Sequence, residues 1–247
     1  MGFKYQQVFV LTDNPYLYRQ FLNLLERKGI PRSMFTFACS KANKSFQETD
    51  NIEGFNIKKD YASLANYDLV FSLHCKQLFP KELVSAKLCI NIHPGLNPHN
   101  RGWFPQVFSI LNGKPLGATL HLIDEEVDHG AIIAQKQVSL YEHDTSLTAY
   151  NRVLEAELAL LDEFLPKILE GTFETHLPAE EGNLNLLADF NKLCEINLEE
   201  QVTFGQAINR LRALTHGHYK NAYFRDSKGN KVFVSIDMAP ENSPEAN

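Results

Sequence analysis

The chain has 247 residues, of which 44% are hydrophobic and 22% are charged, and its formal net charge at pH 7 is -6. This length and composition predict a folded globular protein of one large domain, or one domain with a small appendage. The acidic balance argues against a broad surface for nucleic acid or for an anionic membrane. A local basic pocket for one phosphorylated small molecule is compatible with it.

The chain also lacks the sequence features of membrane insertion and of disulfide frameworks. No apolar stretch is long enough to span a bilayer, and the first residues lack the charged and apolar regions of a signal peptide. Four scattered cysteines, none in a Cys-x-x-Cys pair, indicate free thiols rather than a zinc site. We therefore expect a cytoplasmic protein.

Short apolar runs alternate with helical patterns through the first half of the chain. We expect strands over residues 7–12, 34–39, 68–73 and 87–93, a helix after the first strand, and a polar loop over 40–51. Such alternation is typical of parallel β-α-β units with helices on both sides of one sheet. The expected fold class is therefore α/β with a mostly parallel sheet.

The second half predicts further elements and a C-terminal module. In chain order we expect a helix over 104–111, strands over 117–123 and 131–140, a long helix capped within Asp144–Ser146 and ended by Gly171, a helix capped by Thr203, a hairpin over 221–236 and a frayed end over 240–247. The organisation changes between 173 and 185. We accordingly expect a larger domain, 1–175, and a small module of helix and β-hairpin, 176–247.

Two polar residues end the fourth expected strand. Asn91 and His93 are two positions apart in the apolar run 88–93, and Pro94 and Gly95 follow directly. Residues i and i+2 of a strand project from the same face of the sheet. Burying polar groups at a strand terminus is costly unless they meet a partner or a ligand, so this pair indicates a functional site.

Asp128, further along the chain, adds a carboxylate to this pair. An imidazole can accept a proton from an attacking amine, and a nearby carboxylate orients the ring and stabilises its protonated form. An amide can donate to the oxygen that becomes negative in a tetrahedral intermediate. Together the three predict acyl transfer to nitrogen without a covalent enzyme intermediate. Each residue alone could equally be a satisfied polar group at a strand end.

Four ordered segments carry a resemblance to a known family: Asn91–Pro94, Arg101–Gly102, Gly117–His121 and Asp128–Ile133. This set resembles the formyltransferases that use 10-formyltetrahydrofolate. The resemblance implies a Rossmann-like domain in which Asn91 stabilises the oxyanion, His93 is the general base or proton shuttle, and Asp128 holds the imidazole. His121 could either approach this site or be an ordinary strand histidine.

The resemblance also implies 10-formyltetrahydrofolate as the co-substrate. No metal is expected, and no nicotinamide cofactor either, because no Gly-x-Gly-x-x-Gly follows the first strand. In that family the folate pocket is built largely from the backbone of two loops, which suits the hydrogen-bonding edge of a pterin. By position, these loops contribute the candidate folate-binding residues Lys76, Gln77, Leu78, Asp124 and Val127.

The acceptor is indicated by departures from two branches of the family. The turn Thr12–Tyr16 lacks the glycine-rich phosphate loop of glycinamide ribonucleotide transformylase, and the acidic chain lacks the basic face of methionyl-tRNA formyltransferase. The segments His93–Pro105 and Asn209–Phe224 instead resemble enzymes that N-formylate dTDP-linked 4-amino-4,6-dideoxysugars, closest to dTDP-4-amino-4,6-dideoxyglucose, for surface polysaccharide such as the O-antigen of lipopolysaccharide. Cationic and aromatic side chains suit a diphosphate and a base, which gives the candidate substrate-binding residues Arg101, Trp103, Arg210, Tyr219, Lys220 and Tyr223.

The same residues leave other substrates and a non-catalytic function open, and they predict an oligomeric state. The acceptor could be another nucleotide-linked amino sugar, with a 3-amino group or a UDP carrier, or the chain could be a non-catalytic folate or nucleotide binder. A tRNA substrate is the least favoured. Because an exposed two-stranded hairpin is marginal alone, we expect a homodimer formed through the C-terminal hairpin.

Overall fold

The computed structural model describes residues 2–241, so most of the expected frayed end, 242–247, lies outside the described residues. A seven-stranded sheet has the order β3-β2-β1-β4-β5-β7-β8. The first five strands in this order are parallel, and β7 and β8 are antiparallel to their neighbours. The strands are β1 (Val8–Thr12), β2 (Phe35–Ser40), β3 (Glu53–Phe55), β4 (Leu69–Leu73), β5 (Leu88–His93), β7 (Leu116–Leu122) and β8 (Ile132–Val138).

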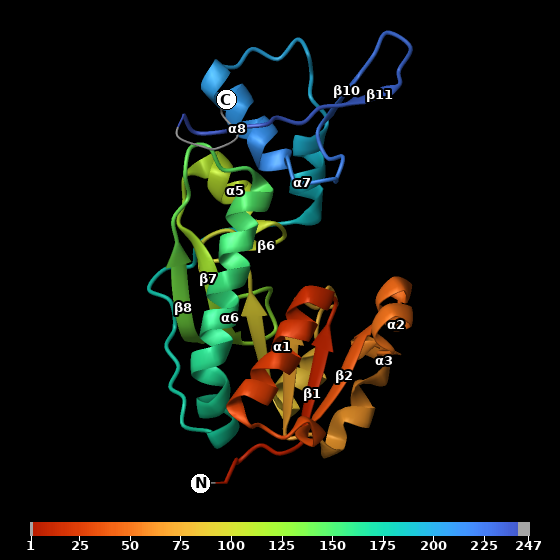
Figure 1. Ribbon diagram of the computed structural model, residues 1–247, viewed down its shortest axis with the longest axis vertical. Coiled ribbons are helices and arrows are strands. Elements are labelled where there is room, and N and C mark those ends of the chain that lie inside the picture. The colour runs from red at the N-terminus through yellow and green to blue at the C-terminus, as the bar shows by residue number, and fades with distance from the viewer. Residues whose placement is uncertain (1, 242–247) are drawn as a thin grey trace.

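Helices cover both faces of this sheet, as expected for the α/β class (Figure 1). On one face α1 (Pro15–Lys28) and α6 (Ser146–Glu170) pack on the strands around buried residues such as Phe21, Phe71 and Leu161. The short elements α3 (Ile57–Asp60), η2 (Tyr61–Asn66) and α4 (Lys81–Ala86) cover the other face. No helix within the described part of the chain is both long and apolar enough to cross a membrane.

Local sequence signals fix the ends of the main helices. Asn14 caps α1 because its Oδ1 accepts a hydrogen bond from Leu17 N at 3.1 Å, an arrangement worth about 1 kcal/mol. Within the expected capping segment Asp144–Ser146, Thr145 is the residue that caps α6, and Gly171 ends the helix in the left-handed region at φ 70°. These elements were therefore predictable from neighbouring residues alone.

The prediction of a loop over 40–51 was wrong. Residues Lys44–Asp50 form the helix α2, and its single buried residue, Phe46, packs against Tyr18 at a ring-centroid distance of 5.6 Å. One apolar residue in a polar stretch gives too weak a periodicity to predict a helix. The three-residue strand β3 and the helix α7 (Leu187–Cys194), in which only Phe190 and Cys194 are buried, were also missed.

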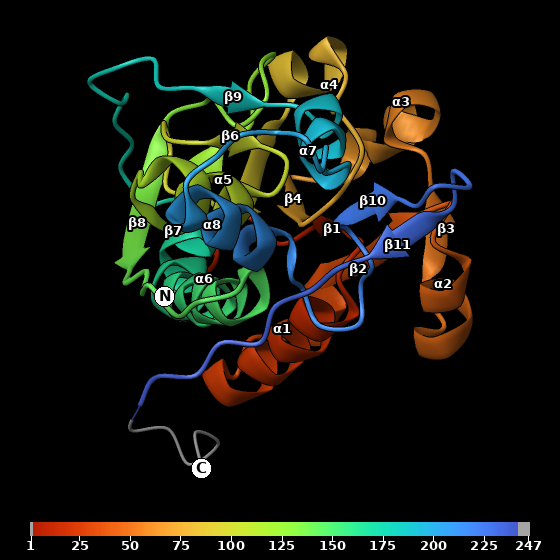
Figure 2. The same cartoon turned by 90° about the horizontal axis from the view of Figure 1, so that it is seen from above.

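The C-terminal module lies beyond the carboxyl ends of the parallel strands (Figures 1 and 2). The helices α7 and α8 (Phe204–Leu214) share a small core with α5 (Pro105–Asn112), which includes Phe190, Ala213 and Val107. The expected hairpin is present as β10 (Tyr223–Arg225) and β11 (Lys231–Phe233). Thr203 caps α8 through a hydrogen bond from Gln206 N, as predicted.

The segment between the two parts returns to the sheet. Its strand β9 (Leu184–Asn185) pairs with β6 (Arg101–Gly102), so that Arg101 N and Trp103 N donate to Asn183 O and Asn185 O at 2.9 and 3.0 Å. Backbone hydrogen bonds therefore fix the loop after β5 to a segment some eighty positions later in the chain.

Candidate active site

The carboxyl end of β5 presents Asn91 and His93, and the adjacent antiparallel strand β7 adds a third polar residue. The register pairs Asn91 with His121 and His93 with Thr119. Asp128 lies in the loop between β7 and β8 and has a backbone φ of 48°, a left-handed conformation that is uncommon for a residue with a side chain. Asn91 and His93 both reach Asp128 from the same face of the sheet.

The distances describe a compact polar cluster. Asn91 Nδ2 donates to Asp128 Oδ1 at 3.2 Å, and His93 Nδ1 lies 3.3 Å from Asp128 Oδ2. Since a carboxylate only accepts hydrogen bonds, the nitrogen of the Asn91 amide must face Asp128. The three side chains predicted from the sequence to act together do lie together.

His121 is a fourth member of this cluster. Its Nδ1 lies 2.7 Å from Leu122 O, which can only accept, so Nδ1 donates there and Nε2 accepts from Asn91 Nδ2 at 3.2 Å. The two hydrogens of the Asn91 amide are thereby directed to Asp128 and His121. The sequence left the position of His121 open, and the structure places it beside Asn91.

The backbone of Asp128 is held by the loop that follows β5. Asn97 Nδ2 donates to Asp128 O at 2.7 Å, and Gly102 N donates to Asp128 Oδ2 at 3.1 Å. Gly102 has φ 89°, and a side chain there would overlap Asn185 O of β9. The carboxylate is therefore fixed by residues on which sequence reasoning had placed no role.

Burial sets the charges of the central pair. Burial lowers the pKa of His93 to about 4, against the opposing effect of the Asp128 carboxylate. Burial alone would raise the pKa of Asp128, but His93, His121 and the Gly102 N–H lower it to about 2. At neutral pH the site therefore holds a neutral imidazole beside a charged carboxylate. His93 Nε2 is buried and has no hydrogen-bond partner within the described chain.

We predict that His93 in the free protein stays neutral well below its usual titration range. As pH falls, the ring should take up a proton with a midpoint near 4 rather than the usual value of about 6.5. An NMR titration of the nine histidine rings measures this, with the His93 signal assigned by its loss in His93→Asn. A His93 midpoint between 6 and 7 would contradict the expected environment.

The candidate folate residues are largely engaged by the chain itself. Lys76 N donates to Asp13 Oδ2 at 3.0 Å, and the Gln77 side chain bonds Ile57 N, Ser40 Oγ and Phe55 O, each at 3.0 Å. Leu78 is 58% exposed. Gln77 thus has a structural role that the sequence did not show, while the exposed Leu78 is free to contact a ligand.

On the second candidate loop, charged groups pair with one another. Asp124 Oδ2 accepts from His129 Nδ1 at 2.8 Å, and Val127 O accepts a long contact from Arg101 at 3.4 Å. Arg101 is buried and bonds Glu181 Oε1 at 2.7 Å, so one carboxylate already faces the guanidinium proposed for phosphate. Its Nε has no partner in the described chain.

The candidates of the C-terminal module separate into two groups. Arg210 donates to Leu193 O and Glu195 O and pairs with Glu200 at 2.8 Å, so its guanidinium is used within the module. Tyr223 donates to Glu195. Both side chains are committed structurally, because each of their polar groups already has a partner. The aromatic and cationic candidates that present free surface are Trp103, Tyr219 and Lys220.

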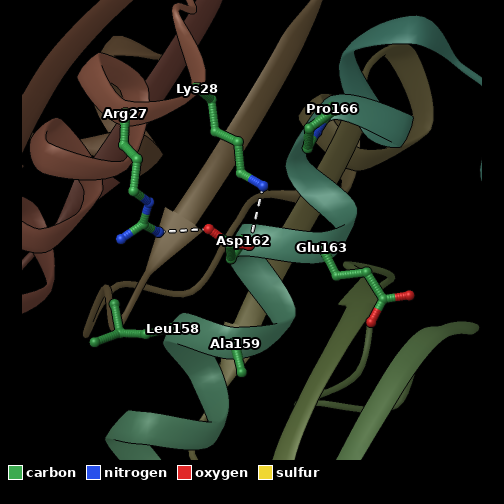
Figure 3. A pocket seen from close by; sticks show the side chains of 7 residues that line it. All are labelled: Arg27, Lys28, Leu158, Ala159, Asp162, Glu163 and Pro166. Carbon is green, nitrogen blue, oxygen red and sulfur yellow. Dashed lines mark hydrogen bonds and ion pairs between the residues drawn. The ribbon is translucent and has the colours of Figure 1, made fainter.

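Two hollows lie away from the polar cluster. One, of about 900 Å³, lies between α1 and α6 and is lined by Arg27, Lys28, Asp162 and neighbours (Figure 3). Both cations there pair with Asp162, and Glu163 supplies a second carboxylate, so the lining residues carry no net charge. The other, of about 720 Å³, lies at the carboxyl ends of β1 and β2 and includes Asp13, Ser40 and Lys76.

Comparison with known proteins assigns the chain to a family. Residues 3–165 match the formyl transferase family, and residues 189–240 match the N-formyltransferase dimerization C-terminal domain. The chain belongs to the formyl transferase family. This confirms the resemblance seen in the ordered motifs, the Rossmann-like α/β fold and the expected class of enzyme.

Three relatives illustrate the match. The dTDP-4-amino-4,6-dideoxyglucose formyltransferase of Mycobacterium tuberculosis (strain ATCC 25618 / H37Rv) is 41% identical over 97% of this chain and 99% of its own length. The crystal structure of a 4-N formyltransferase from Francisella tularensis superposes with a TM-score of 0.87, with 43% identity over 95% of this chain and 98% of that one. A formyltransferase from Anoxybacillus kamchatkensis, solved with UDP-4,6-dideoxy-4-formamido-L-AltNAc and tetrahydrofolate, covers 75% of this chain and 88% of its own at 26% identity and a TM-score of 0.60.

Proposed function

We propose that this protein transfers the formyl group of 10-formyltetrahydrofolate to the 4-amino group of a dTDP-linked 4-amino-4,6-dideoxysugar. The observation that carries the chemistry is the buried cluster of Asn91, His93 and Asp128, with a neutral imidazole whose Nε2 has no partner in the described chain. The acceptor is supported by the names of the relatives that match nearly the whole chain.

In the proposed mechanism each residue has a separate task. The folate supplies the formyl group. His93 accepts the proton that the attacking amine loses, through the unpartnered Nε2. Asp128 keeps the proton of the free ring on Nδ1 and stabilises the imidazolium once it forms. Asn91 turns one amide hydrogen toward the formyl oxygen as that oxygen becomes negative. As the tetrahedral intermediate collapses, the bond from the formyl carbon to N10 of the folate breaks, and protonated His93 returns its proton to N10, which gives the amide and tetrahydrofolate.

Gly95 leaves room for the His93 ring in this arrangement. A Cβ atom at position 95 would overlap Nε2 of His93. We therefore expect Gly95→Ala to displace the ring and to lower kcat about a hundredfold, the effect of misplacing a reacting group by about 1 Å. Steady-state kinetics tests this, with Gly205→Ala on the exposed surface of α8 as the matched control. Full activity of Gly95→Ala would show that the ring position is not critical.

A mass-spectrometric assay tests the proposed function directly. Wild-type protein is incubated with 10-formyltetrahydrofolate and dTDP-4-amino-4,6-dideoxyglucose, and the product should be heavier by one CO. Parallel reactions with 3-amino and UDP-linked amino sugars test the alternative acceptors. Binding of folate and nucleotide without product from any amine would support the non-catalytic alternative instead. Salt-sensitive association with tRNA would revive the least favoured one.

We also propose a two-fold homodimer formed through the C-terminal module, with residues 1–175 as the catalytic domain and 176–247 as the module. Support comes from the dimerization family matched by residues 189–240 and from the free edge of the two-stranded hairpin. Val232 and Phe233 on β11 are 37% and 44% exposed, and Phe204 on α8 is 90% exposed. Large exposed apolar side chains of this kind are typical of an interaction surface.

Val232→Glu should convert the dimer into a monomer at micromolar concentration, because it places a charge in the proposed apolar interface. Sedimentation velocity of the variant and of the wild type measures the change. Glu155→Gln, at an exposed position on α6, is the control and should remain dimeric. A wild-type monomer under these conditions would exclude the proposed assembly.

The cellular setting belongs to the same proposal. Reaction in the cytoplasm and a product used for surface polysaccharide such as O-antigen are the expectations that accompany the proposed acceptor. All four cysteines are free, which is compatible with a reducing compartment.

A further inference from the structure

A second, partly buried polar cluster lies at the point where the strand order of the sheet reverses. From β1 the chain moves outward to β2 and β3, and then returns to place β4 on the other side of β1. Asn14 follows β1 and His74 follows β4, and Asn14 Nδ2 lies 3.2 Å from His74 Nδ1. In open α/β sheets, ligands bind outside the carboxyl ends of the strands at such a switch point.

This second cluster adjoins the proposed catalytic one. The register pairs Leu73 of β4 with Ile92 of β5, so His74 and His93 are the next positions on neighbouring strands. Tyr150 and Glu157, both on α6, complete the second cluster. Tyr150 OH lies 3.2 Å from His74 Nδ1, and His74 Nε2 lies 2.6 Å from Glu157 Oε1.

The capping bond of Asn14 fixes how this cluster is protonated. Because Asn14 Oδ1 accepts from Leu17 N, its Nδ2 must be the atom that faces His74. An amide nitrogen only donates, so His74 Nδ1 is an acceptor, and Nε2 carries the proton and donates to Glu157. His74 itself has φ 54°, a backbone conformation in which a histidine is strained.

The cluster contains buried polar groups that do not contribute to folding by burial of apolar surface. Glu157 is fully buried, and its Oε2 has no hydrogen-bond partner in the described chain. Burial raises the pKa of Tyr150, and the carboxylate of Glu157 raises it further, so Tyr150 keeps its O–H. Burying such groups is costly, and no step of the proposed formyl transfer uses them.

The cluster also connects the sheet with the C-terminal module. The ring of Tyr150 lies 5.5 Å from that of His216, and His216 lies 5.8 Å from Tyr219. Tyr219 is 60% exposed. Polar and aromatic side chains thus follow one another from the switch point, through Tyr150 on α6, to a surface residue of the module.

We propose that Asn14, His74 and Tyr150 form the wall that orients the amino sugar of the acceptor beside His93. Asn14 Nδ2 also donates to Tyr150 OH at 3.3 Å, and the two groups would give up this mutual hydrogen bond for hydrogen bonds to the hydroxyl or amino groups of the sugar. Glu157 is a positioning residue, because it holds the ring of His74 in one tautomer. This inference rests on the proposed function and specifies which residues of the site read the acceptor.

Binding measurements on the whole protein test the inference. Tyr150→Phe removes one hydroxyl and should raise the dissociation constant of dTDP-4-amino-4,6-dideoxyglucose roughly two- to tenfold, the loss of one hydrogen bond. The dissociation constant of folinic acid, a formyl-folate probe, should stay unchanged. Calorimetry measures both constants. Tyr67→Phe, at the amino end of β4, makes the same change away from the site and should alter neither.

Two further positions separate recognition from folding. Asn14→Asp keeps an oxygen for the helix cap, but its second carboxylate oxygen faces His74 Nδ1, and neither atom can donate a hydrogen bond to the other. This variant should therefore weaken binding of the amino sugar at least as much as Tyr150→Phe. Glu157→Ala should weaken acceptor binding, and Glu157→Gln should restore most of it, since an amide oxygen still accepts from His74 Nε2. If these residues only stabilised the fold, the variants would instead change the dissociation constants of the amino sugar and of folinic acid together.

The outcomes distinguish this inference from the proposed function. The inference is overturned if both Tyr150→Phe and Asn14→Asp bind the amino sugar as the wild type does, or if only folinic acid binds more weakly. The proposed formyl transfer would still hold in either case, provided that the wild type turns over. Wild-type protein that forms no product with any nucleotide amino sugar overturns the proposed acceptor, and this inference with it.

Discussion

Replacing His93 with asparagine should lower kcat by about a hundred- to ten-thousandfold, the range contributed by a general acid–base group. The ring is 4% exposed, and its pKa of about 4 keeps it neutral at pH 7, so it can accept the proton of the attacking amine. Asparagine fills part of the same space, but its amide cannot accept that proton. The formylation assay at saturating concentrations of both substrates measures the loss.

The control for this variant is His143→Asn. His143 is exposed and stacks on Tyr141 at a ring-centroid distance of 5.4 Å, in the turn that precedes α6. It should turn over like the wild type. Thermal melting of His93→Asn should still show a cooperative transition, because the surrounding strands are buried on both faces. Turnover within threefold of the wild type would exclude His93 as the base.

Asn91→Ala should lower kcat by about a hundred- to thousandfold, the usual effect of removing one oxyanion donor. In the free protein the amide of Asn91 also donates to Asp128 and to His121. The variant therefore loses both the oxyanion donor and the link that aligns the carboxylate. Single-turnover kinetics of the formylation step measures this loss without interference from product release.

Asn151→Ala is the matched control, because Asn151 lies on the exposed face of α6. It should retain wild-type kinetics. The far-ultraviolet circular dichroism of Asn91→Ala should match that of the wild type, since a single side chain at a strand end is removed. If the chemical step of Asn91→Ala proceeds at the wild-type rate, another donor must support the oxyanion.

The elements with strong local patterns were predicted correctly. The apolar runs that became β1, β2, β4 and β5 alternate with helical patterns, and the caps Thr145, Gly171 and Thr203 lie beside the helices they end. The helix α2 was missed because Phe46 is its only buried residue. Periodicity predicts an element only where several residues of one face are buried.

The candidate site was predictable in part for the same reason. Asn91 and His93 are two residues apart in one strand, so their shared face follows from strand geometry alone. Asp128 was added through the ordered motifs of the family. The commitments of Gln77 and Arg210 to their own chain were not predictable, because their partners lie on other elements.

By itself the sequence determined the α/β class, the principal helix ends and the polar pair on β5, since each depends on residues close together in the chain. Only the tertiary structure decided three contacts. His121 bonds Asn91, β9 pairs with β6 in the loop after β5 that contacts Asp128, and His74 bonds Glu157, which lies 83 residues further along the chain. Antiparallel register and strand crossovers create these contacts. Neither is encoded in the spacing of neighbouring residues, so the partner of a buried polar group is known only once the sheet is assembled.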